Sequence, residues 1–97
     1  MPYIERKDRK LLDPQIIRLA GQLESEGELN YVISRLCHFV IGEENNIGEK
    51  FVNRTYAGLN SVMGVLECVK QEFYRTVVAP YEDTKKEQNG PVSNLDA

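Results

Sequence analysis

A segment near the end of the chain, QEFYRTVVAPYEDTKK at positions 71–86, gathers side chains that are better suited to binding than to bond making. Tyrosine rings stack on planar ligands, and the arginine guanidinium offers paired donors to phosphate. The segment GELNY at 27–31 adds an amide and a further ring. The candidate ligand-binding residues are Asn30, Tyr31, Tyr74, Arg75 and Tyr81. We expect Arg75 to donate to a phosphate, the tyrosines to stack and Asn30 to orient the ligand.

The helical spacing of the same residues also allows a purely structural interpretation. Tyr74 and Tyr81 lie seven residues apart and share a helix face, whereas Arg75 points away from the apolar face. At the edge of a core, tyrosine rings cover apolar neighbours while their hydroxyls stay in water. Arg75 would then pair with Glu72 in an exposed contact worth about a few tenths of a kcal/mol. The sequence leaves both interpretations open.

Metal-dependent nucleotide hydrolysis is the main catalytic alternative for a small acidic helical protein. Mg²⁺ requires clustered carboxylate oxygens, which such enzymes supply from E-E-x-x-E and E-x-x-D elements on neighbouring helices. Glu43 and Glu44 are followed by no acid three residues later, and Glu82 and Asp83 are adjacent, so they point about 100° apart on a helix. The carboxylate pattern therefore disfavours a hydrolase, and we assign no metal ligand.

The cysteines and the single histidine do not form a recognisable catalytic set. His38 follows Cys37 directly, and adjacent helical residues do not face each other. Cys68 could approach His38, but a cysteine and histidine without an orienting group are typical of packing, and two cysteines with one histidine make a poor zinc site. The chain also lacks a glycine-rich phosphate loop. We predict a protein that is not an enzyme and has no cofactor.

Composition limits the class of protein. The 97 residues have a net charge of −3, are 41% hydrophobic and are 28% charged, values typical of one soluble domain. We place this domain at 1–90 and a tail at 91–97. No apolar run is long enough to span a membrane, and the first residues do not resemble a secretory signal, which predicts a cytoplasmic protein without a membrane partner. The net negative charge disfavours nucleic acid as a partner.

The sequence pattern of the first half of the chain predicts an arm followed by two helices. The charged segment 1–12 is interpreted as the arm, and Asp13 with Pro14 as the start of a helix over 14–25 that ends at Gly27. The next helix lies between Gly27 and Gly42. Apolar residues occur on two of its sides, so we expect it to be buried on both, with one side against another subunit.

The second half predicts a loop over 43–55 and one long helix. Thr55 is interpreted as the cap of this helix rather than as part of a glycosylation acceptor. Gly58 and Gly64 are expected to allow close approach of a neighbouring backbone. Pro80 should kink the helix, which continues to Asn89–Gly90. The sequence thus predicts an all-α fold: a small bundle of three main helices that forms a homo-oligomer.

Three strings of the sequence resemble an uncharacterised family of small bacterial and phage proteins. They are GELNYVISRL (27–36), GVLECVKQEFYRTVVAPYEDTKKEQNG (64–90) and the opening MPYI. By analogy, small phage proteins of this size often act against host defences, several of them as oligomers that sequester nucleotide signals between subunits. The resemblance thus implies a nucleotide-derived ligand in the host cytoplasm. The alternative is a module that binds a host or phage protein.

Overall fold

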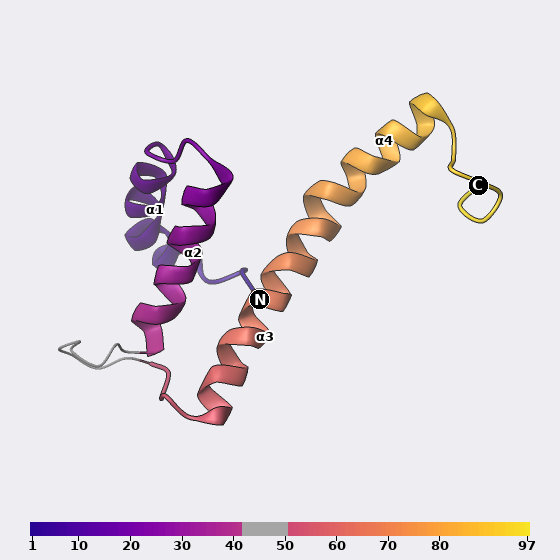
Figure 1. Cartoon of the computed structure of the whole chain (residues 1–97). Coiled ribbons are helices and arrows are strands. Elements are labelled where there is room, and N and C mark those ends of the chain that lie inside the picture. Colours follow the sequence, from indigo (N-terminus) through magenta and orange to yellow (C-terminus); the bar gives the residue numbers. More distant parts are fainter. Residues whose placement is uncertain (42–50) are drawn as a thin grey trace. The chain divides into compact units, whose positions relative to one another are not determined.

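The computed structural model of the protein describes residues 1–41 and 51–97, and every regular element within these ranges is a helix (Figure 1). The predicted all-α class is therefore confirmed, with three principal helices of which the last is the longest. The chain divides into two compact units, Pro2–Gly64 and Val65–Ala97, the latter grouped with Met1. Each unit is described by itself.

Helix α1 spans Arg6–Ala20 and begins eight residues earlier than the sequence predicts. The carbonyl oxygen of Glu5 accepts the amides of Asp8 and Arg9 at 3.0 and 3.2 Å, so the charged segment joins the helix. Arginine, lysine and leucine are good helix formers, and their summed preference exceeds the local signal for a start at Asp13. Pro14 consequently lies inside the helix, and the predicted arm shortens to the residues before Arg6.

Helix α2 spans Glu26–Ile41, so Gly27 lies within it and does not terminate the preceding helix as predicted. The start is fixed by two hydrogen bonds: the amide of Glu28 donates to Ser25 Oγ at 3.1 Å, and the amide of Glu24 donates to Glu28 Oε1 at 2.6 Å. A serine followed three residues later by a glutamate is the sequence pattern of a helix N-terminus. This pattern marks the boundary more strongly than the glycine does.

Helix α3, Tyr56–Phe73, starts as predicted at a Thr55 cap, because the amide of Gly58 donates to Thr55 Oγ1 at 3.1 Å. The approach to this helix is fixed by the amide of Val52, which donates to the carbonyl of Val40 at 3.3 Å. Val52 is the one buried residue among those that the structure describes, with 8% of its surface exposed. Residues 43–50 of the predicted loop, including Glu43 and Glu44, lie outside the described residues.

The apolar faces of the Pro2–Gly64 unit are only partly covered. Leu12 and Ile16 on α1 and Leu36 on α2 remain exposed. Val32 and Val40 on α2 are half-buried. Within this unit, the burial expected on two sides of α2 is therefore not reached, because the packing elements of the unit are too few to cover both sides.

Candidate functional site

The long C-terminal helix changes its geometry where two of the candidate residues lie. Helix α3 passes into a π-helical segment, η1 (Tyr74–Val78), and then into α4 (Ala79–Asn89) without a break in the ribbon (Figure 1). The amide of Ala79 donates to the carbonyl of Tyr74, five residues earlier. Pro80 has no amide to donate to the carbonyl four residues before it, so a wider turn accommodates the proline within a continuous helix.

The end of this helix is set by glycine. Gly90 has a φ of 88°, a left-handed conformation that residues with a Cβ rarely adopt, and its amide donates to the carbonyl of Lys86 at 2.8 Å. The predicted continuation past Pro80 and the predicted stop at Asn89–Gly90 are both confirmed.

Tyr74, Arg75 and Tyr81 are all exposed on the Val65–Ala97 unit, the two rings by 52% and 63%. Arg75 Nη2 donates to Glu72 Oε1 at 2.5 Å, which confirms the predicted pair. The Arg75 side chain is 69% exposed, so screening by water limits the pair to well below about 1 kcal/mol. An anionic ligand could therefore draw Arg75 away from Glu72 at small cost.

A second cation lies beside this surface and was not singled out in the sequence. Lys85 Nζ lies 5.6 Å from the centroid of the Tyr81 ring, a cation–π contact between residues four apart on α4. The same spacing places the Arg35 guanidinium 4.4 Å from the Phe39 ring on α2. The i, i+4 spacing of a cation and a ring is the signal that could have identified both contacts.

Asn30 and Tyr31 lie on α2, in the Pro2–Gly64 unit. Ser34 Oγ donates to Asn30 Oδ1 at 3.3 Å, and Tyr31 is 64% exposed. The structure therefore groups the candidates into two sets: one turn of α2 carries Asn30 and Tyr31, and the η1–α4 segment carries Tyr74, Arg75 and Tyr81. Both sets are accessible to a ligand.

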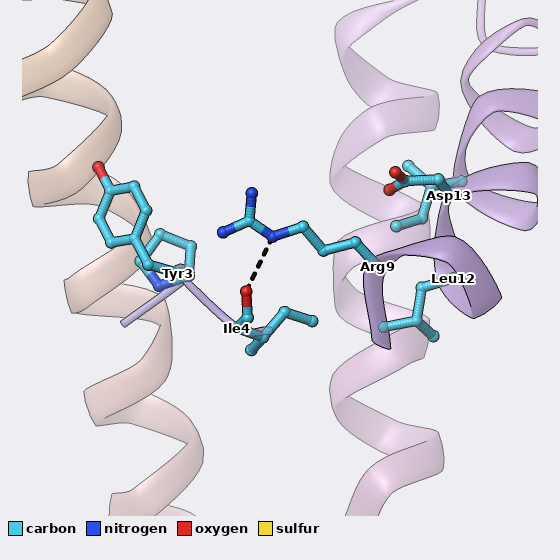
Figure 2. Close-up of a pocket in the computed structure, with 7 residues that line it drawn as sticks. Tyr3, Ile4, Arg9, Leu12 and Asp13 are labelled. Atoms are coloured by element: carbon cyan, nitrogen blue, oxygen red, sulfur yellow. Dashed lines mark hydrogen bonds between the residues drawn. The ribbon is translucent and has the colours of Figure 1, made fainter. Parts of the chain in front are cut away.

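A pocket of about 330 Å³ lies between the residues that precede α1 and the first turns of that helix (Figure 2). Arg9 Nε donates to the carbonyl of Ile4 at 2.9 Å, and the Arg9 side chain extends away from Asp13 toward Ile4 and Tyr3. Most of the lining is apolar. The lining residues are Pro2, Tyr3, Ile4, Arg9, Leu12, Asp13 and Ile16. Sequence reasoning treated these residues as arm and helix start, so the pocket was missed.

The tail forms a hydrogen-bonded turn around Asp96, whose pKa is lowered. The amides of Ser93 and Val92 donate to the Asp96 carboxylate at 2.9 and 3.1 Å, and these bonds lower the pKa of Asp96. Asp96 also lines a second pocket, of about 320 Å³. The other residues that line it are Glu82, Asp83, Lys85, Lys86, Gly90 and Val92.

We expect the tail turn to be lost in acid. Because the folded-state pKa of Asp96 is depressed, its contribution is fully present above the unfolded-state pKa of about 3.9 and is lost as the pH falls through the folded-state value. Amide chemical shifts of Val92 and Ser93, followed from neutral pH to about pH 2, should show the transition. In Asp96→Asn these shifts should not titrate in that range; an unchanged titration would mean that another group controls the turn.

Within residues 1–41 and 51–97, no three His, Cys, Asp or Glu side chains are grouped so that they could hold a metal ion. Cys37 is half-buried and Cys68 is exposed, and both are free thiols. Among the helices of the described residues, none combines the length and apolar character needed to cross a membrane.

Fold and site together define a small all-helical protein with aromatic and basic side chains exposed on a long helix interrupted by a π turn. Residues 1–92 match the model of a domain of unknown function, DUF6899, and the chain belongs to this family. The predicted membership of an uncharacterised family is thereby confirmed. No curated protein and no solved structure matches the chain.

Proposed function

We propose that the protein is a non-catalytic binding protein that sequesters a nucleotide-derived anion in pockets between the subunits of a homo-oligomer. The observation that carries the proposal is the exposed set of Tyr74, Arg75 and Tyr81 around the π turn, with Lys85 beside the Tyr81 ring. π turns occur disproportionately at functional sites. Two rings and two cations on one short stretch suit a ligand that has both a planar base and a phosphate.

Each side chain has a separate role in this proposal. Tyr74 and Tyr81 stack on the base, and Arg75, with five N–H donors of which one bonds to Glu72, donates to the phosphate. Tyr31 and Asn30 of another subunit close the pocket and orient the ligand. The resemblance to phage proteins extends the proposal to an immune signalling nucleotide that is held in the host cytoplasm.

The test is native mass spectrometry and calorimetry of the whole protein with a panel of cyclic and ADP-ribose-type nucleotides. We expect intact ligand to be retained, and Arg75→Ala and Tyr81→Ala each to weaken binding by roughly tenfold or more, because each removes one charge-assisted hydrogen bond or one stacked ring. The matched controls are Arg18→Ala and Tyr56→Ala, which remove an exposed arginine and an exposed tyrosine elsewhere. If no nucleotide binds, or if the controls weaken binding equally, the proposal is wrong; Mg²⁺-dependent loss of the nucleotide would instead indicate a hydrolase.

A second candidate function is a protein-interaction module acting on a host or phage protein. It is favoured by the exposed apolar residues of the Val65–Ala97 unit, such as Phe73 at 58% and Val69 at 53%. Soluble proteins rarely leave such a continuous apolar face in water. Recovery of a stoichiometric polypeptide in place of a small molecule would favour this function.

A further inference from the structure

The Val65–Ala97 unit carries a continuous apolar seam that nothing in the unit covers. The seam residues recur at spacings of three, four, four and four, and four of the five are more than half exposed. The seam consists of Leu66, Val69, Phe73, Val77 and Tyr81. Spacings of three and four along one face are typical of one helix packing along the length of another.

The π turn keeps this seam continuous. With a regular repeat of 3.5 residues, the positions after Phe73 would be Thr76 and Pro80, a polar residue and a proline. The π turn inserts one extra residue into the helix between 74 and 78, so that Val77 and Tyr81 take these places. Without the insertion, the apolar line would drift around the helix by about 100° at this point. The irregular turn thus serves packing along the whole helix.

Charged side chains flank the seam in a pattern that specifies orientation. Lys70 and Lys85 lie on one flank, and Glu72 and Glu87 lie on the other, once the extra residue of the π turn is counted. A parallel pair of such helices keeps the two lysine flanks apart, whereas an antiparallel pair would bring lysine flank against lysine flank and glutamate flank against glutamate flank.

The existing ion pairs of these flanks do not prevent such an arrangement. Lys70 Nζ lies 3.6 Å from Glu67 Oε2, and Arg75 pairs with Glu72, both within one turn and both exposed on at least one side chain. Exposed ion pairs of this kind contribute little to stability, so their side chains can change partners readily.

We propose that this seam binds a second copy of the same chain, parallel and in register. Burying the exposed parts of the seam and its apolar neighbour Val65 on both copies would remove on the order of 1,000 Å² from water, the size at which specific interfaces begin. Such a contact is isologous, because each copy presents the same surface. Tyr81 ends the seam, so the Tyr74–Arg75 surface lies at the edge of the pair. The proposal does not rest on ligand binding.

Disulfide trapping of the whole chain tests the pairing and its orientation. In a Cys37→Ser, Cys68→Ser background, Val69→Cys places one thiol on the seam, where a parallel in-register partner presents the same residue. We expect most of the protein to form a covalent dimer on mild oxidation. The matched control, Gln71→Cys, lies on the opposite side of the helix and should form several-fold less. Equal trapping at both positions, or none at Val69→Cys in a protein that is oligomeric, would overturn the proposal.

Sedimentation of the unmodified protein over a dilution series provides the second measurement. We expect a mass of at least two chains, with helix content that falls as the protein dissociates, because most of the stability of a helix in a protein comes from packing of its apolar face. Neither measurement requires a nucleotide, so pairing is judged separately from the proposed ligand. A monomer whose helix content does not change on dilution would overturn the proposal and assign the seam to the chain's own Pro2–Gly64 unit.

Discussion

Gly58→Ala should destabilise the protein by about 2–4 kcal/mol, because the first turn of α3 has no room for a Cβ. A Cβ at this position would collide with the backbone carbonyl oxygen of Asn53 and would lie 3.1 Å from Val52 Cγ1. The carbonyl cannot easily withdraw, since it also accepts the Thr55 amide at 2.9 Å. Val52 is held on the other side by its bond to Val40.

Gly64→Ala is the matched control, since it makes the same change in the same helix. A Cβ at Gly64 meets nothing within 4 Å, so the substitution should stabilise the helix by about 0.5–1 kcal/mol through the lower backbone entropy of alanine. Urea denaturation of the two variants, read by circular dichroism, should give shifts of opposite sign. Equal and small effects would show that the contact with Asn53 does not constrain the fold.

These two glycines illustrate what the sequence could and could not predict. The periodicity of the long helix, the Thr55 cap and the stop at Gly90 depend on local chemistry and were predicted correctly. The predicted close approach of a neighbouring backbone is present at Gly58. At Gly64, no atom of the described residues lies within 4 Å of an added Cβ. A sequence shows where a Cβ is missing. Only the tertiary structure shows which atom, if any, occupies the space that the Cβ would take.

The predicted start of the first helix and the predicted stop at Gly27 were wrong for a related reason. Asp13 with Pro14 and then Gly27 offered strong local signals, yet the helix formers of the charged segment and the Ser25–Glu28 capping bonds outweighed them. Several signals compete at each boundary, and only their summed free energies decide the outcome.

The candidate surface was predictable in part. Spacing alone places Tyr74, Arg75 and Tyr81 on neighbouring positions of one helix and pairs Arg75 with Glu72. The π turn was not predicted, because a proline in a helical pattern indicates a kink or a stop and does not show how the backbone absorbs it. Periodicity likewise identifies the apolar face of a helix, but not what covers it.

Pro80→Ala should have opposite effects on the helix and on its association. Restoring the amide allows a regular α-helix through 74–81, which we expect to raise the intrinsic stability of the helix by up to about 3 kcal/mol. Loss of the extra residue would also rotate Tyr81 by about 100° relative to Leu66 and Phe73, away from the seam. Helix content at high dilution should therefore increase while self-association weakens.

Circular dichroism and sedimentation of the same samples separate these two effects. Asp83→Ala serves as the control, because it also introduces alanine into α4 but lies beyond the π turn and about 200° around the helix from Tyr81, away from the seam. It should raise helix content slightly and leave association unchanged. If Pro80→Ala strengthens both properties together, the π turn is only an accommodation of the proline and the seam does not depend on it. If helix content rises while association falls, the irregular turn is retained because it keeps the apolar line straight for a partner.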